Sequence, residues 1–246
     1  MFYTDPGPYH FNHCYRGRTV NWSGLDSEQN FISHCQDATK RHQLDKLGWL
    51  ENDCVTYQYN AQGFRTSELD ARPSGLALGC SHTEGVGVPV SMTWPSQLSQ
   101  LVGIHIWNFG VGGSSKDTAF RLLDHYVKIL NLKFVILCGP TKYRFEIACT
   151  DNEFLNLTVN TDNSKLKFFA NEWFLQDNNS ELNTKKNLLA MQQICDQNHI
   201  PFFYIDIDSE PWYFMFDAQA RDLAHPGVVA HKKLSEKIFD LIRGKI

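Results

Sequence analysis

The stretch Gly75-Leu-Ala-Leu-Gly-Cys-Ser81-His-Thr-Glu84 decides how the rest of the chain is interpreted. Its first five residues are small or apolar, which is typical of a short strand buried on both faces. A polar, glycine-containing loop follows Ser81 and continues to Val88. In α/β proteins the ligand crevice lies outside the carboxyl ends of the strands. The stretch therefore predicts a serine hydroxyl at the mouth of a crevice.

Strand patterns alternate with helix patterns downstream of this stretch. Further short apolar runs occupy residues 104–108, 133–138 and 200–205. Helical spacing of apolar residues occupies 93–102, 117–131 and 181–198, and a last helix begins at Pro226. The alternation favours an α/β fold with a parallel sheet and helices on both of its faces.

Several polar loops follow the predicted strands and should therefore meet at one edge of the sheet. They are the loop at Ser81, the glycine loop 110–113, the loop 139–141, and the loop that holds Asp222 and His225. A nucleophilic serine needs a base and a third group that orients the base. Our hypothesis is that Ser81, His225 and Asp222 form one catalytic triad. The alternative for Ser81 and Asp222 is ordinary turn or helix-cap chemistry.

The glycine loop is the candidate source of oxyanion donors. Glycine at Gly112 and Gly113 lets backbone amides approach a ligand closely, and preorganised donors stabilise the oxyanion of acyl transfer. The alternatives are a plain strand-to-helix turn or a phosphate cradle. A phosphate loop of the Gly-Lys-Ser type does not occur in the sequence.

These motifs together resemble those of the SGNH (GDSL-like) hydrolase superfamily, over roughly residues 74–246. The matching blocks are Gly79-Cys80-Ser81, then Asn108-Phe-Gly110-Val-Gly-Gly113, then Asp222-Leu-Ala-His225. The resemblance implies a three-layer α/β/α sandwich with a flavodoxin-like central sheet. It implies that Ser81 is the nucleophile, His225 the base and Asp222 its partner, with the Ser81 and Gly113 amides as oxyanion donors. The implied chemistry is ester hydrolysis or acyl transfer without a metal or cofactor.

The sequence departs from the family pattern in two places. Cys80 replaces the usual Asp before the nucleophile. In the third block, Thr141 stands where family members carry the Asn whose side chain donates to the oxyanion. Either Thr141 or Arg144 could supply that donor, or the hole could consist of the two amides alone. A missing donor predicts a slower enzyme.

Four residues near these loops are candidate substrate contacts: Arg144, Glu84, Gly112 and Trp212. Aromatic side chains in the loops could stack on sugar rings, and ordinary core packing is the alternative for each of them. His82 follows the nucleophile directly, and neighbouring side chains normally point apart, so we do not expect it to act as the base.

The leading functional hypothesis is a serine esterase that removes an acyl group, in particular an acetyl group, from an ester on a carbohydrate. A first alternative is an O-acyltransferase that uses the same triad and excludes water from the site. A second alternative is a catalytically weak or inactive binding protein that retains the fold, which the altered third block would explain.

Length and composition bound the organisation of the chain. The 246 residues suggest one main domain at 73–246, an insertion at about 140–182, and an irregular N-terminal extension at 1–72. The net charge of −4 gives no argument for a nucleic-acid partner. No apolar run is long enough to span a membrane, and the start lacks a signal-peptide pattern, so we expect a cytoplasmic protein. The oligomeric state stays open.

The cysteine and histidine residues do not indicate a metal site. Seven cysteines without a secretory signal are expected to be mostly reduced. The residues His10, His13, Cys14, His34 and Cys35 could suggest a zinc site, but their spacing fits no standard pair of ligands. We therefore expect no metal.

Overall fold

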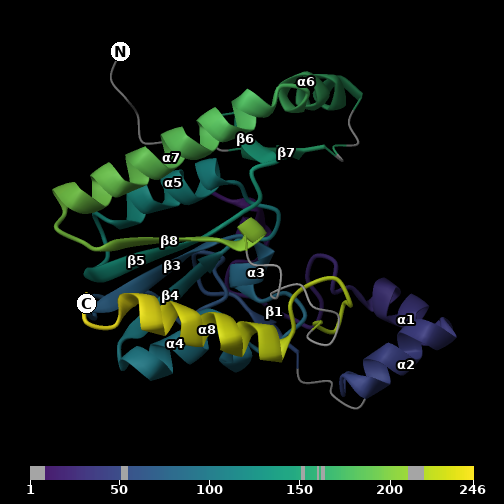
Figure 1. Cartoon of the computed structure of the whole chain (residues 1–246). Coiled ribbons are helices and arrows are strands. Elements are labelled where there is room, and N and C mark those ends of the chain that lie inside the picture. Colours follow the sequence, from purple (N-terminus) through teal and green to yellow (C-terminus); the bar gives the residue numbers. More distant parts are fainter. Residues whose placement is uncertain (1–8, 51–54, 151–152, 160, 162–163, 210–218) are drawn as a thin grey trace.

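A parallel sheet forms the centre of the molecule. The computed structural model describes residues 9–50, 55–150, 153–159, 161, 164–209 and 219–246. In the sheet, the four strands lie in the order β4 (His105–Gly110), β3 (Ser74–Gly79), β5 (Leu132–Gly139) and β8 (Phe202–Asp206), and every neighbouring pair is parallel. Helices cover both faces (Figure 1), so the predicted α/β fold with three layers is confirmed.

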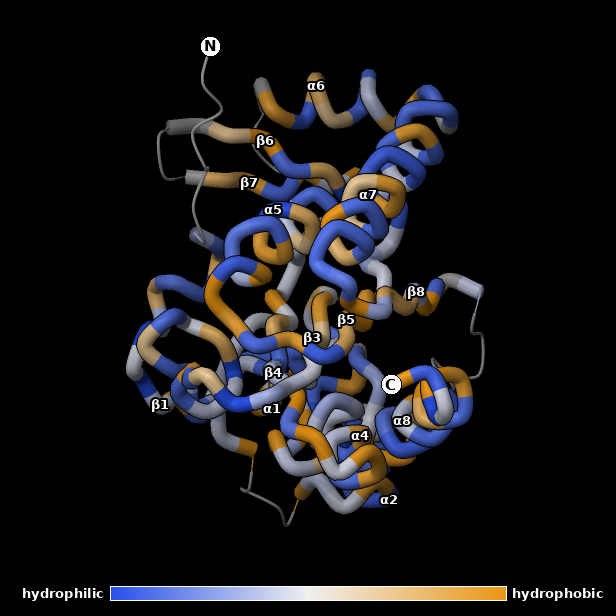
Figure 2. The backbone as a smooth tube through the Cα atoms, turned by 90° about the vertical axis from the view of Figure 1, so that its left-hand side faces the viewer, coloured by the Kyte–Doolittle hydropathy of each residue, from blue (hydrophilic) through white to orange (hydrophobic). Residues whose placement is uncertain are grey.

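Two pairs of helices make the outer layers. On one face lie α5 (Lys116–Tyr126) and α7 (Asp177–Gln197), and on the other lie α4 (Trp94–Val102) and α8 (Val228–Ile242). Figure 2 shows the same layers from the side, with hydrophilic and hydrophobic residues alternating along these helices. Such alternation is expected of helices that bury one face. The helix predicted to reach residue 131 ends at Tyr126, which leaves five residues to enter β5.

The sequence of β3 suits the middle of this sandwich. All six of its residues are buried, because helices cover the sheet on both sides. Leu76 and Leu78 pack in the hydrophobic cluster beneath α5 and α7. Ala77 points the other way and packs in the cluster beneath α4 and α8. The strand ends at the carboxyl edge of the sheet, and Ser81 begins the short helix α3 (Ser81–Glu84) two residues later.

The N-terminal segment packs against the main domain through its own small core. It contains a 3-10 helix (Phe11–Tyr15), β1 (Thr19–Val20), α1 (Glu28–Gln36), α2 (Ala38–Lys46) and β2 (Tyr57–Gln58), with β1 and β2 antiparallel. Strand β2 is only two residues long. Leu44, Trp49 and Tyr57 are buried in one cluster with Val88 and Ala220 from the main domain.

The segment predicted as an insertion forms elements of its own. An antiparallel hairpin of β6 (Arg144–Thr150) and β7 (Glu153–Thr158) precedes α6 (Ser164–Phe174). The buried ion pair between Arg121 of α5 and Glu146 of β6, 2.8 Å from Nη2 to Oε2, attaches the hairpin to the main domain. The remaining elements are 3-10 helices at Val90–Met92 and Ile207–Ser209. Among the described helices, none is both long and apolar enough to cross a membrane.

A second buried ion pair joins the N-terminal segment to the loop that carries Asp222. Arg221 donates from Nε to Asp26 Oδ1 at 3.0 Å and from Nη2 to Oδ2 at 2.8 Å. Tyr57 donates its hydroxyl to the same carboxylate, 2.5 Å away. Both charged side chains are almost fully buried. Removal of one partner would leave the other charge buried without compensation.

We therefore expect Asp26→Ala to lower the free energy of unfolding by about 3–5 kcal/mol. The matched control is Asp240→Ala, which removes the exposed pair between Asp240 and Arg243, 3.3 Å apart. The control should cost less than about 1 kcal/mol, because water screens an exposed pair. Urea unfolding of both variants measures the difference, and equal costs would contradict a structural role for the Asp26 pair.

Candidate active site

The turn from β3 into α3 positions the candidate nucleophile. Cys80 adopts an extended conformation at the N-cap of α3, and Ser81 is the first residue of the helix. Because the first amides of a helix have no acceptor within it, the Ser81 N–H is left free for other partners. The Ser81 side chain lies in a largely buried position at the edge of a pocket.

The second motif braces this turn from the neighbouring strand. Asn108 Nδ2 donates to the Thr83 carbonyl at 2.9 Å, and Asn108 Oδ1 accepts from the Gly110 amide at 2.9 Å. A Cβ at Gly110 would lie only 2.0 Å from the Glu84 nitrogen. Only glycine therefore lets the end of β4 approach α3 this closely. Asn108 and Gly110 together hold the turn that carries Ser81 against the end of β4.

Ser81, His225 and Asp222 lie in hydrogen-bond contact, although Ser81 and His225 are 144 positions apart. His225 Nε2 is 2.8 Å from Ser81 Oγ, and His225 Nδ1 is 2.5 Å from Asp222 Oδ2. Asp222 Oδ1 also accepts from the amides of Ala224 and His225, at 3.0 Å each. The geometry is that of a nucleophile, a base and a group that orients the base.

The surroundings of Asp222 favour its ionised form. Burial alone would raise its pKa, but the hydrogen bonds from the His225 ring and from the two amides outweigh burial, and the pKa of Asp222 is lowered. His82 also lies nearby, with its ring perpendicular to that of His225 and the ring centres 5.6 Å apart. Burial and the neighbouring His225 hold the pKa of His82 well below its usual value. The Ser81 hydroxyl is within hydrogen-bond distance of His225.

Gly112 and Gly113 of the glycine loop both line the pocket, and their amides differ in their contacts. Gly113 has a φ of +73°, a left-handed conformation that favours glycine. Its amide has no backbone acceptor in the described part of the chain. The Gly112 amide instead donates to Glu84 Oε2 at 2.7 Å. Gly112 therefore holds the loop in place, and its amide is not available to a substrate.

Glu84, a predicted substrate contact, lines the same pocket as Ser81, and its carboxylate has hydrogen-bond partners within the protein. Its side chain is buried, with 1% of its surface exposed. Oε1 accepts from the Tyr59 hydroxyl at 2.7 Å, and Oε2 accepts from the Gly112 amide. Because both oxygens already have donors, Glu84 links the nucleophile helix to the glycine loop and to the N-terminal segment. Sequence patterns gave no sign of this link, since Tyr59 lies in an irregular region.

Thr141 is not brought to the Ser81 pocket. Its hydroxyl accepts from the Tyr143 amide at 3.5 Å, and it does not line that pocket. Arg144, three residues later, does line the pocket, and its Nη1 donates to the Ser114 carbonyl at 3.4 Å. Trp212, the remaining candidate substrate contact, lies outside the described residues.

The pocket beside the triad has a volume of about 470 Å³ and draws its walls from three parts of the chain. The main domain supplies Ser81, Glu84, Val86, Gly112, Gly113 and His225. The N-terminal segment and the β6–β7 hairpin supply the rest of the wall, including Phe11, Asn12, Ser23, Leu25, Phe154, Leu155, Asn156 and Thr158. Sequence analysis missed these wall residues, because neither segment carries a periodic pattern that predicts its position.

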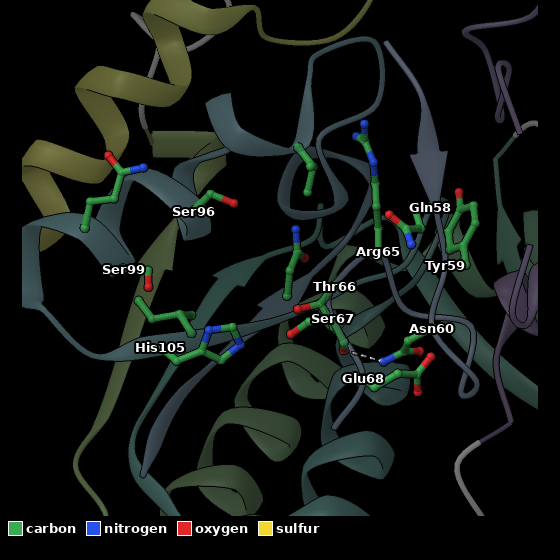
Figure 3. Close-up of a pocket in the computed structure, with 14 residues that line it drawn as sticks. Gln58, Tyr59, Asn60, Arg65, Thr66, Ser67, Glu68, Ser96, Ser99 and His105 are labelled. Carbon is green, nitrogen blue, oxygen red and sulfur yellow. Dashed lines mark hydrogen bonds between the residues drawn. The ribbon is translucent and has the colours of Figure 1, made fainter. Parts of the chain in front are cut away.

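A second cavity, about 550 Å³ in volume, lies between the N-terminal segment and α4 and does not contain the triad. Figure 3 shows Ser96, Ser99 and His105 on one side of it, and Thr66, Ser67 and Asn60 across from them. The described residues contain no cluster of three or more His, Cys, Asp or Glu side chains that could hold a metal ion.

Comparisons with known proteins give only distant structural likenesses. No family model and no curated protein matches the sequence. An acetyl xylan esterase from the rumen bacterium Butyrivibrio proteoclasticus aligns at a TM-score of 0.39 and 11% identity, over 73% of this chain and 65% of that one. A lipolytic G-D-S-L protein from Veillonella parvula aligns at 0.38 and 13%, over 70% and 100% of the two chains. A lipase/acylhydrolase from Enterococcus faecalis aligns at 0.38 and 15%, over 70% and 96%.

The contacts of Glu84 give a prediction about the glycine loop. Glu84→Gln keeps the shape of the side chain but replaces one of its two acceptor oxygens by a donor, so the Tyr59 hydroxyl and the Gly112 amide can no longer each donate to an oxygen of their own. We expect the free energy of unfolding to fall by about 1–3 kcal/mol, and the turnover of an ester to fall with little change in KM. Urea unfolding and ester kinetics measure both effects.

Glu68→Gln is the matched control for this variant, because Glu68 is exposed and, within the described residues, accepts from the Ala61 amide alone. It should leave both quantities near those of the unmodified protein. If Glu84→Gln behaved in the same way as this control, Glu84 would not hold the glycine loop.

Proposed function

We propose that this protein is a serine esterase of the SGNH type. The observation that carries the proposal is the continuous contact from Ser81 Oγ to His225 Nε2, and from His225 Nδ1 to Asp222. The motifs at Asn108 and Gly110, which brace the nucleophile turn, support the same proposal. The three-layer fold with these loops at one edge of its sheet is the arrangement that the resemblance to this superfamily implies.

The proposed reaction proceeds in two steps. His225 takes the proton of the Ser81 hydroxyl as Oγ attacks the ester carbonyl, and Asp222 holds the imidazole in position and stabilises its charge. The tetrahedral oxyanion then collapses to an acyl-serine, and the alcohol leaves with the proton from His225. In the second step, His225 takes a proton from water, the resulting oxygen attacks the acyl-serine, and the free acid and the Ser81 hydroxyl are released.

The Ser81 and Gly113 amides are the proposed oxyanion donors. Removing one such donor from a hydrolase costs roughly 3–4 kcal/mol of transition-state stabilisation. Thr141 is not among the residues that line the pocket, which supports an oxyanion hole made of the two amides alone. A site with two amide donors would be a slower catalyst than one with three.

An acetyl ester on a carbohydrate remains the proposed substrate class. The mixed pocket walls support it, because polar side chains such as Asn12 and Asn156 suit sugar hydroxyls. Apolar side chains such as Phe11 and Phe154 suit the faces of sugar rings.

The proposal predicts that the protein hydrolyses para-nitrophenyl acetate through Ser81. Ser81→Ala should lower kcat/KM by at least about 10⁴-fold, because it removes the nucleophile. Ser33→Ala is the control, since Ser33 is an exposed serine on α1. Release of nitrophenolate measures each rate. Equal rates for Ser81→Ala and the unmodified protein would refute the proposal.

A further inference from the structure

Arg144 differs from the arginines that are buried in this protein. Arg121 and Arg221 are each paired with a carboxylate, and Arg65 donates to four backbone carbonyls. Arg144 has one contact, a long hydrogen bond from Nη1 to the Ser114 carbonyl at 3.4 Å, and no ion pair in the described part of the chain. A guanidinium carries five N–H donors, so most donors of Arg144 have no acceptor within the described residues.

The Arg144 side chain lines the pocket that contains Ser81 and His225. Arg144 begins β6, and it is the only Lys or Arg among the described residues that line the pocket with Ser81 and His225. The nearby carboxylates do not satisfy it. Glu84 is engaged by Tyr59 and Gly112, and Asp222 is engaged by His225 and two amides.

We propose that Arg144 forms a subsite for a carboxylate of the substrate, so that the preferred ester is an anion. The inference rests on the proposed esterase function and names its substrate class. The planar fork of a guanidinium matches the two oxygens of a carboxylate. A single cation balances a single negative charge, whereas a dianion such as a phosphate monoester would also meet the negative charges of Glu84 and Asp222.

The carboxylate could belong to the alcohol part or to the acyl part of the ester, and two pairs of substrates separate these sources. Para-acetoxybenzoate and para-acetoxybenzamide differ in the charge of the alcohol part. Mono-para-nitrophenyl succinate and para-nitrophenyl butyrate differ in the charge of the acyl part. Hydrolysis of each consumes one water and releases the acid and the phenol.

The test measures kcat/KM for each pair with the unmodified protein, Arg144→Gln, Arg144→Lys and the control Lys142→Gln. Lys142 is two residues away and pairs with Glu181 outside this pocket. In one of the two pairs, Arg144→Gln should lower the preference for the charged ester by about tenfold to a hundredfold, because a hydrogen-bonded ion is lost. Arg144→Lys should restore part of the preference, and Lys142→Gln should leave it unchanged.

Two results would overturn the inference. The first is that the charged and neutral esters lose the same factor in Arg144→Gln, since Arg144 would then serve the oxyanion or the fold. The second is that the unmodified protein shows no preference for the charged member of either pair. In both cases hydrolysis itself would persist, so the esterase proposal would stand.

A binding measurement separates the subsite from catalysis. In the Ser81→Ala background, para-acetoxybenzoate and mono-para-nitrophenyl succinate are titrated by calorimetry against their neutral partners. We expect one anion to bind more tightly than its partner, and the difference to vanish in Ser81→Ala/Arg144→Gln and to weaken with added salt. Equal binding of both members of each pair would reject the subsite even if the protein proved to have no esterase activity.

Discussion

The buried carboxylate of Glu84 joins the parts of the chain on which the candidate active site depends. It lies at the end of the nucleophile helix, and it accepts hydrogen bonds from Tyr59 of the N-terminal segment and from Gly112 of the glycine loop. A buried charge is costly unless its oxygens are hydrogen-bonded. The three segments therefore stabilise the charge together, and displacement of any one would leave an oxygen without a donor. Such networks rigidify the groups that they connect.

Buried polar contacts also hold the loop that carries Asp222 and His225. Asp26 forms an ion pair with Arg221, the residue before Asp222. The Tyr57 hydroxyl donates to the Asp26 carboxylate and accepts from the Gly87 amide. The N-terminal segment is thus part of the support for the triad and part of the pocket wall. Residues 73–246 by themselves lack this support and this part of the pocket wall.

Sequence patterns predicted the parts of the site that depend on local structure. The strand before Ser81 is recognisable because all of its residues are small or apolar, and the parallel order of strands places Ser81 near the loop of Asp222 and His225. The roles of Glu84 and the pocket walls depend on contacts between distant polar segments without periodicity, so they could not be predicted in this way. The position of the Thr141 side chain could not be predicted either, because a motif identifies a residue in the chain but not the path of the loop that carries it.

The loop that follows β5, residues 140–143, leads into Arg144 at the pocket. The Thr141 hydroxyl accepts from the Tyr143 amide, and Arg144, three residues after Thr141, lines the pocket beside Ser81. A permanent positive charge close to the nucleophile favours negative charge in whatever binds there. In the proposed reaction, the few residues that follow β5 would therefore influence which substrate is preferred.

The most direct test of the central claim is whether His225 makes Ser81 nucleophilic. A fluorophosphonate probe, followed by peptide mass spectrometry, reports which hydroxyl reacts and how fast. We predict labelling at Ser81 in the unmodified protein, and labelling slowed by at least about a hundredfold in His225→Ala, because general-base assistance contributes at least that factor. Labelling at another residue, or labelling of Ser81 at the same rate in both proteins, would contradict the account.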